Sequence, residues 1–336
     1  MSENGARRPG LRALADLATP MAVRVAATLR LADRVEQGLC TAPLLAEATG
    51  THPDALERLL RHLVTVGLFT EKPRGNFALT EYGRQLCEGH EGGRRQWLDT
   101  TTAVGRGDLS LVDLEHSVRT GEAAYHVRHG VPFWDDLSAD PRLSASFDAL
   151  MGHHVGYDGG AVVDAYDWGA LGHVVDVGGG SGALLCALLK AHPRLEGTLV
   201  DLQGPASAAR RSFRNEGLSD RARAVVGSFF DPLPAGAGGY VLSSILHDWA
   251  DDPAAQILGR CAEAAGSGGT VLVVEAVGAD GESPSTAMDL RMLVYSGGRE
   301  RGLSDLGGLA ERAGLSLRAV HPAGYISVVE LAVEGD

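Results

Sequence analysis

Apolar residues recur at intervals of three and four over the first quarter of the chain, which predicts helices there. Polar and glycine-rich positions separate these helices, and a short pair of strands follows them. Three helical segments and a hairpin, in that order, are typical of a winged helix. The predicted elements are a helical stretch at 11–38 broken near Pro20, helices at 41–50 and 51–67, and a hairpin at 68–83 with its turn at 72–76.

A different pattern begins near Gly172, where short apolar runs of strand length alternate with helical segments. This alternation predicts a parallel sheet covered by helices on both faces. The last two apolar runs, within 315–333, have no helix between them and predict an antiparallel pair at the end of the sheet. We therefore expect an α/β fold, doubly wound and mostly parallel, in three regions: a winged-helix-like domain at 1–95, a helical linker at 96–160 and a ligand-binding domain at 161–336.

Composition narrows the range of partners. The chain has 336 residues and a formal net charge of −13, which disfavours nucleic acid and anionic membrane surfaces. Its four cysteines are far apart, and no apolar stretch has the length of a signal peptide or a membrane span. We expect a cytoplasmic protein. The third predicted helix mixes acids with arginines, which favours a packing or dimerisation module over DNA recognition.

A glycine-rich turn, DVGGGSG at 176–182, lies between the first strand and the first helix of the predicted sheet. Glycines allow the backbone to approach a ligand closely. Asp201 ends the next strand, 21 residues after Gly180, where a ribose-binding carboxylate belongs. Together they predict an adenosine-containing ligand, either NAD or S-adenosylmethionine. In the alternative interpretation, Asp201 only caps the following helix.

Three features favour S-adenosylmethionine. Asp176, directly before the glycines, would repel a pyrophosphate but can face the ammonium and sulfonium of this ligand. The antiparallel strand pair comes after the strand–helix repeats. Finally, aromatic residues that include Phe229 follow the third strand and suit the edge of an adenine.

Several motifs in order resemble those of the plant-type small-molecule O-methyltransferases. They are DVGGGSG, VDLQGP, GSFFDPLP, ILHDWADD, VLVVEAV and MLVYSGGRERG, and the resemblance spans almost the whole chain. Within this family the chain is most similar to actinobacterial enzymes that act on naphthoate and anthracycline precursors. The resemblance implies an S-adenosylmethionine-dependent enzyme of antibiotic biosynthesis that methylates a phenolic hydroxyl of an aromatic polyketide-type acceptor. It also implies a homodimer formed through the N-terminal domain.

The resemblance further implies roles for single residues. His247, in the His-Asp-Trp motif, would be the general base, with Glu275 and Glu300 flanking and orienting its imidazole. Gly178 and Gly180 would lie along the cofactor, and Asp201 would bind the ribose. The other expected cofactor contacts are Asp176, Leu202, Phe229 at the adenine, Ser228 where many relatives have an acid, and Ser243 where some plant members have a lysine.

An apolar pocket near the base would accept a flat aromatic ring. A carboxylate on the acceptor would need a cation, for which Arg12, Arg291 and Arg299 are candidates; the family suggests that the N-terminal helix of one subunit closes the pocket of its partner. We expect no metal, because His126, His129, His153 and His154 lack an accompanying Cys or acid at ligand spacing. The expected acceptor-side residues are Arg12, Trp97, Phe147, Met151, His154, Met288, Met292 and Tyr295.

Direct methyl transfer needs the acceptor oxygen in line with the methyl group. A phenol has a pKa of about 10 and an ordinary imidazole about 6.5, so a carboxylate must stabilise the imidazolium that forms. Two alternatives remain open at this point. One is an enzyme that keeps the fold and cofactor but has lost methylation; the other is a winged-helix regulator that senses an adenosine ligand.

Overall fold

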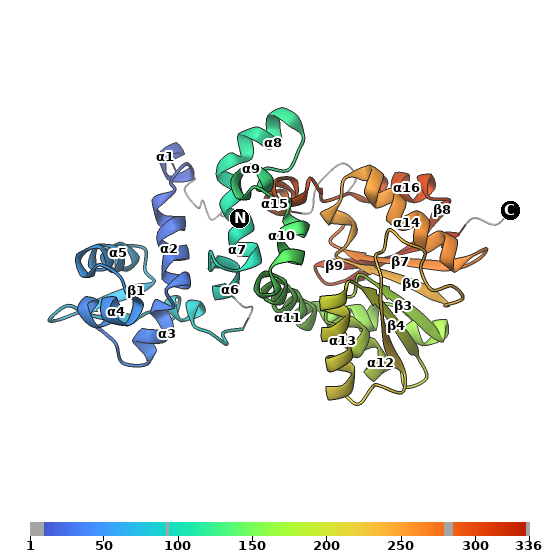
Figure 1. Ribbon diagram of the computed structural model, residues 1–336, viewed down its shortest axis with the longest axis horizontal. Coiled ribbons are helices and arrows are strands. Elements are labelled where there is room, and N and C mark those ends of the chain that lie inside the picture. Colours follow the sequence, from blue (N-terminus) through green and yellow to red (C-terminus); the bar gives the residue numbers. More distant parts are fainter. Residues whose placement is uncertain (1–9, 92–93, 279–284, 334–336) are drawn as a thin grey trace, which may run out of the picture. The chain divides into compact units, whose positions relative to one another are not determined.

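The computed structural model describes residues 10–91, 94–278 and 285–333, without the side chains of 153–158. The chain divides into two compact units, Met1–Arg106 and Gly107–Asp336, and each has its own core (Figure 1). The boundaries near 95 and 160 that the sequence suggested remain predictions.

The first unit is helical with one small hairpin. Buried leucines and two phenylalanines, Phe69 and Phe77, fill its core. Its elements are α1 (Leu11–Leu14), α2 (Ala18–Thr28), α3 (Leu31–Glu36), α4 (Ala42–Thr49), α5 (Pro53–Thr65), β1 (Phe69–Lys72), β2 (Asn76–Leu79), η1 (Gly83–Leu86) and α6 (Arg94–Leu98), with α7 (Ala103–Asp108) crossing the division.

The break predicted near Pro20 is confirmed, since residues 15–17 separate α1 from α2. Pro20 lies in the first turn of α2, where the backbone N–H groups have no partner within the helix, so a proline is tolerated. The carboxylate of Asp16 accepts hydrogen bonds from the N–H groups of Ala18 and Thr19 and fixes the start of this helix. A second interruption, which the sequence did not predict, lies at Arg30, whose φ is +54°.

The second unit begins with short helices and then a long one that leads into the sheet. The long helix α11 starts at Pro141, and Asp140 caps it by accepting the N–H of Arg142 at 2.8 Å. The elements before the sheet are η2 (Leu109–Asp113), α8 (Leu114–Thr120), α9 (Tyr125–His129), α10 (Phe133–Ala139), α11 (Pro141–Ala165) and η3 (Trp168–Leu171).

Seven strands form the sheet, in the order β5-β4-β3-β6-β7-β9-β8. The first five are parallel, and β9 pairs antiparallel with both β7 and β8, so the predicted α/β architecture with an antiparallel end is confirmed. The strands are β3 (His173–Val177), β4 (Glu196–Asp201), β5 (Ala222–Val226), β6 (Gly239–Ser243), β7 (Thr270–Glu275), β8 (Leu315–Ala323) and β9 (Ile326–Val333).

Helices cover both faces of this sheet (Figure 1). Apolar side chains of α14 and α16 pack on one face, and those of α11, α12 and α13 pack on the other. The chain order reverses between β3 and β6, and ligands of open α/β sheets bind at the carboxyl ends of strands at such a point. The remaining elements are α12 (Ala183–Ala191), α13 (Gln203–Asn215), η4 (Leu246–Asp248), α14 (Asp251–Ala265), α15 (Thr286–Ser296) and α16 (Leu303–Arg312).

Among the described residues, no helix is both long and apolar enough to cross a membrane. All four cysteines are free thiols.

Candidate active site

The glycine-rich turn directly follows β3 and is shaped by positive φ angles. Gly178 has φ +72° and Gly180 has φ +58°, a region that glycine enters without strain. The N–H of Gly178 donates to the carbonyl of Val200 on β4 at 2.8 Å. A Cβ on Gly179 would lie 2.2 Å from Oδ2 of Asp176, so the turn passes directly over this carboxylate.

Asp176 is 2 % exposed, and neither of its carboxylate oxygens has a hydrogen-bond partner among the described residues. Burial, followed by the charge of Asp201, raises the pKa of this carboxyl to about 7. A buried carboxylate without a partner is costly unless a ligand supplies one. S-adenosylmethionine carries an ammonium and a sulfonium, and these positive charges fit this requirement.

Asp201 connects β4 to the glycine-rich turn. Its Oδ2 accepts the N–H of Gly180 at 2.9 Å and its Oδ1 accepts that of Leu202 at 2.6 Å. Leu202 occupies the N-cap of α13, so Asp201 braces the turn instead of capping that helix. Burial, followed by the charge of Asp201, raises the pKa of Asp148, on α11, to about 6. Asp148 was not among the site residues predicted from the sequence.

The other expected cofactor contacts lie at the same edge of the sheet. Phe229 lies against the glycine-rich turn, 3.3 Å from where a Cβ of Gly178 would be, and stacks edge-on with Trp249. Ser228 accepts the N–H of Phe230 through its Oγ at 3.2 Å, which holds the turn that carries both phenylalanines. Leu202 is exposed beside Asp201, and Ser243 ends β6.

His247 lies in a tight turn after β6. Ser244, in this turn, has φ +53°, an uncommon angle for a residue other than glycine. Glu275 ends β7, and its Oε1 accepts three successive backbone N–H groups, those of residues 245, 246 and 247, at 3.1, 2.6 and 3.3 Å. Glu275 therefore contacts His247 at the backbone N–H and not at the imidazole, which was its expected place.

Glu300 contacts the imidazole directly. Its Oε1 lies 2.9 Å from Nδ1 of His247, and Oδ1 of Asp248 lies 3.7 Å from Nε2. Burial lowers the pKa of His247, but the charge of Asp248, the hydrogen bond to Glu300 and the charges of Glu275 and Glu300 outweigh it and raise the pKa to about 10. Burial raises the pKa of Asp248 to about 6. Without ligands, the imidazole is thus protonated at neutral pH.

The segment that carries Glu300 packs against the histidine turn. A Cβ on Gly298 would lie 2.2 Å from the carbonyl oxygen of His247, so only glycine permits this approach. The N–H of Arg299 donates to that same oxygen at 2.9 Å. Arg301, 4 % exposed, donates to the carbonyls of Leu246 and Trp249 at 2.7 and 2.8 Å. Arg301 was not among the predicted site residues, although it follows Glu300 directly.

Aromatic rings form a continuous cluster beside the histidine turn. Trp134 stacks on Trp249 with centroids 6.2 Å apart, and Phe147 meets Trp134 edge-on at 5.5 Å. Phe133 joins Phe147 to Tyr295. Of the other expected acceptor-side residues, Met292 is buried on α15, and Met288 on α15 and Met151 on α11 are half-buried.

Two of the three candidate arginines are already engaged. Arg291 donates to Oδ1 of Asp108 at 2.7 Å, and the hydroxyl of Tyr295 donates to the same oxygen at 2.5 Å. Arg299 pairs with Asp251 at 3.5 Å. Arg12 is exposed, with no ion pair to any described residue.

Three expected residues cannot be placed in this arrangement. Arg12 and Trp97 belong to the first unit, which is described by itself. His154 lies on α11, but its side chain is outside the described part of the chain.

Comparison with known protein families shows which family the chain belongs to. A model of the O-methyltransferase domain matches residues 111–316, and a model of the O-methyltransferase dimerisation domain matches residues 11–89. The chain belongs to the O-methyltransferase family. The second match also agrees with the interpretation of the winged-helix-like region as a dimerisation module.

Characterised relatives of this methyltransferase cover almost its full length. A 2,7-dihydroxy-5-methyl-1-naphthoate 7-O-methyltransferase of Streptomyces carzinostaticus is 65% identical over 96% of this chain and 97% of its own. Aclacinomycin 10-hydroxylase RdmB of Streptomyces purpurascens is 46% identical over 94% of this chain and 86% of its own. The structure of NcsB1, an O-methyltransferase from neocarzinostatin biosynthesis in complex with S-adenosylmethionine and 2-hydroxy-5-methyl naphthoic acid, has a TM-score of 0.95 at 63% identity, covering 98% of this chain and all of that one.

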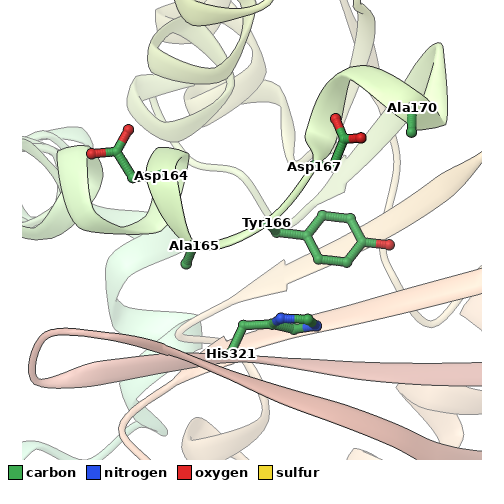
Figure 2. A pocket seen from close by; sticks show the side chains of 6 residues that line it. All are labelled: Asp164, Ala165, Tyr166, Asp167, Ala170 and His321. Carbon is green, nitrogen blue, oxygen red and sulfur yellow. The ribbon is translucent and has the colours of Figure 1, made fainter.

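A separate surface hollow of the methyltransferase lies between the end of α11 and β8 (Figure 2). In it the ring of Tyr166 stands edge-on to His321, with centroids 5.2 Å apart, and His321 pairs with Glu330 at 3.3 Å. It contains none of the residues expected in the site. The hollow is lined by Asp164, Ala165, Tyr166, Asp167, Ala170 and His321.

Proposed function

We propose that this chain methylates a phenolic hydroxyl of a hydroxynaphthoic acid in antibiotic biosynthesis, with S-adenosylmethionine as the methyl donor. The observation that carries the proposal is the pairing of His247 with Glu300 at 2.9 Å, at the same sheet edge as a glycine-rich turn over an unpartnered carboxylate. The naphthoate 7-O-methyltransferase relative and the naphthoic acid bound to NcsB1 support the choice of acceptor.

The bound cofactor supplies an electrophilic methyl group on a sulfonium. Asp176 would hold its positive charge from beneath the turn, since the acid is buried and has no other partner in the described part of the chain. Gly178 and Gly180 would allow close backbone contact, Asp201 would accept from the ribose hydroxyls, and Phe229 would contact the adenine.

His247 would accept the phenolic proton at Nε2 while Glu300 stabilises the imidazolium through Nδ1. The raised pKa of His247, about 10, makes the imidazole about as basic as a phenolate. This removes the mismatch between an ordinary imidazole and a phenol. It also requires that the ring first lose its proton, so turnover should increase as the pH rises.

Arg12 is the cation best suited to the acceptor carboxylate. Arg291 and Arg299 are held by Asp108 and Asp251, whereas Arg12 is exposed and unpaired among the described residues. In a homodimer formed through the N-terminal domain, α1 of one subunit would bring Arg12 to the pocket of its partner.

Exposed leucines on and after α1 support such a dimer. Leu11, Leu14 and Leu17 are 82, 67 and 66 % exposed, which is unusual for apolar side chains that meet no partner. The mass of the protein in solution, measured by light scattering, tests the dimer. We further propose a cytoplasmic location, since four free cysteines suit a reducing compartment.

The decisive experiment incubates the enzyme with methyl-labelled S-adenosylmethionine and a panel of hydroxynaphthoates, salicylates and anthracyclines. We expect label in a methoxy group of the naphthoates. The similarity to a hydroxylase, RdmB, favours one second candidate, hydroxylation without methylation. Product mass separates the two, because one product gains a methyl group and the other gains oxygen.

A further inference from the structure

Three metal-ligating side chains meet on the surface formed by α8 and α9, and the proposed reaction uses none of them. His116 lies on α8, His126 on α9 and Glu122 in the connection between these helices. Their ligand atoms all lie within 4.8 Å of one another. The sequence spacing is irregular, so the cluster exists only because the connection folds α9 back onto α8.

His116 contributes a buried ring nitrogen to this cluster. Its Nε2 is buried and has no hydrogen-bond partner among the described residues. The nearest carboxylate oxygen, Oε2 of Glu122, lies 4.0 Å away, which is too long for a hydrogen bond. The rings of His116 and His126 meet edge-on, at 81°, with centroids 5.6 Å apart. Three ligand groups thus lie within reach of one ion, and His116 Nε2 and Glu122 are too far apart to bond each other.

We propose that His116, Glu122 and His126 bind a Zn²⁺ ion, with water completing the coordination. Two imidazoles and a carboxylate are a frequent zinc ligand set, with Zn–N and Zn–O distances of about 2.0–2.2 Å. A tetrahedral ion then needs ligand atoms roughly 3.3 Å apart, so the side chains must close by about an ångström. Glu122 is 71 % exposed and His126 is also exposed, so both can turn toward the ion.

The ion would join α8 to α9 and stabilise both. These two helices pack against α15, which carries Met292 and Tyr295 on the acceptor side of the proposed site. Metal binding would therefore make the position of α15 more rigid, and the metal would take no part in the methyl transfer. The expectation that the reaction itself needs no metal is unaffected.

The proposed zinc ligands differ from His126 and His129, the pair whose sequence spacing would suggest a metal site. His126 and His129 are one helical turn apart on α9, but the ring of His129 packs on Tyr125, with centroids 4.4 Å apart. His129 therefore provides a matched control: a histidine on the same short helix that lies outside the proposed site.

The test is calorimetric titration of chelator-stripped full-length protein with Zn²⁺, together with its thermal unfolding. We expect one ion per chain and a higher Tm when it is bound. Loss of an outer-shell partner already weakens metal sites roughly 10–100-fold, so His116→Ala and His126→Ala should weaken binding at least as much. His129→Ala and His247→Ala should bind as the parent does.

Glu122→Ala keeps the test decisive if a histidine variant fails to fold, because Glu122 is an exposed side chain. It should weaken Zn²⁺ binding while leaving the metal-free Tm unchanged. The proposal is overturned if the parent shows no saturable binding, if all three ligand variants bind as tightly as the parent, or if His247→Ala abolishes binding.

Discussion

Two turns at the carboxyl edge of the sheet gather buried acids, but they differ in how those acids are satisfied. In the glycine-rich turn after β3, Asp176 has no partner among the described residues. In the histidine turn after β6, Glu275 accepts three backbone N–H groups and Glu300 accepts from His247. The glycine-rich turn thus offers Asp176 no positive charge from the described residues, whereas the histidine turn contains its own in His247.

The buried acid of the glycine-rich turn needs a ligand to be paired, whereas the acids of the histidine turn are paired within the protein. An unpartnered buried acid destabilises the ligand-free protein, and a cationic ligand removes that penalty on binding. In the histidine turn the acids already have partners, so we expect its geometry to depend little on bound ligands. Mutations in the first turn should therefore alter cofactor affinity and stability, and mutations in the second should alter turnover.

His247→Ala should have the largest effect. Loss of a general base lowers turnover by roughly 10²–10⁴-fold, and cofactor affinity should stay close to that of the parent. Single-turnover kinetics and calorimetric titration with S-adenosylmethionine measure the two quantities. Normal turnover in this variant would remove the proposed mechanism.

Asp176→Asn tests the other turn through stability. The pKa of about 7 lies above the ordinary 3.8, so the folded protein keeps a proton that the unfolded chain releases. The free energy of unfolding should then fall as pH rises from 4 to 7, by at most about 4 kcal/mol from this group. The variant should lack this slope, and it should bind S-adenosylmethionine more weakly.

Denaturant unfolding at pH 5 and pH 8, in the absence of cofactor, measures this slope. Asp220→Asn, at an exposed acid, is the matched control. Equal pH dependence in the parent and in Asp176→Asn would mean that this acid has a partner in the free protein.

Gly298→Ala should damage the histidine turn without removing any catalytic group. The added Cβ meets the backbone of His247 and Asp248 at 2.2 and 2.6 Å, so the segment carrying Glu300 must move. A displacement of about 1 Å at a reacting group can lower turnover by as much as 10²-fold. Gly307→Ala on α16, where a Cβ meets nothing within 4 Å, should leave kcat unchanged. Comparing kcat for the two variants measures the effect.

Asp248→Asn should have the smallest effect, a displacement of the pH profile. Among the groups that raise the pKa of His247, the charge of Asp248 has the largest effect. In the proposed mechanism the neutral imidazole is the active form. Removing this charge lowers that pKa, so the acid limb of kcat/KM should move to lower pH by about one unit or more. Profiles of both enzymes from pH 6 to 10 check this. An unmoved limb would mean that another ionisation controls the rate.

The sequence predicted the fold well because its signals are local. Alternating strands and helices, the glycine-rich turn and the motif around His247 each lie within a short stretch, and strand ends necessarily meet at one edge. The break near Pro20 was predicted, but the interruption at Arg30 was not, because no proline or glycine marks it in the sequence.

The supporting residues could not be predicted in the same way. Asp148 comes from the long helix α11, Asp108 precedes its partners on α15 by more than 180 residues, and Arg301 acts through backbone carbonyls. None of these belongs to a periodic pattern or a short motif. Their roles depend on tertiary packing, and so does the use of Glu275 to hold the backbone of the turn.

The continuity of α15 with the Gly297–Gly298 segment has a consequence for enzyme engineering. One helix carries Met288, Met292 and Tyr295 and then leads through these glycines to Glu300. The residues expected to set the acceptor range and those that hold the catalytic histidine are therefore neighbours in the sequence. A library meant to broaden the acceptor range should randomise 288 and 292 while keeping 297–301 fixed. Substitutions within 297–301 would inactivate the enzyme for every acceptor, and a screen would misread such clones as unable to bind the new acceptor.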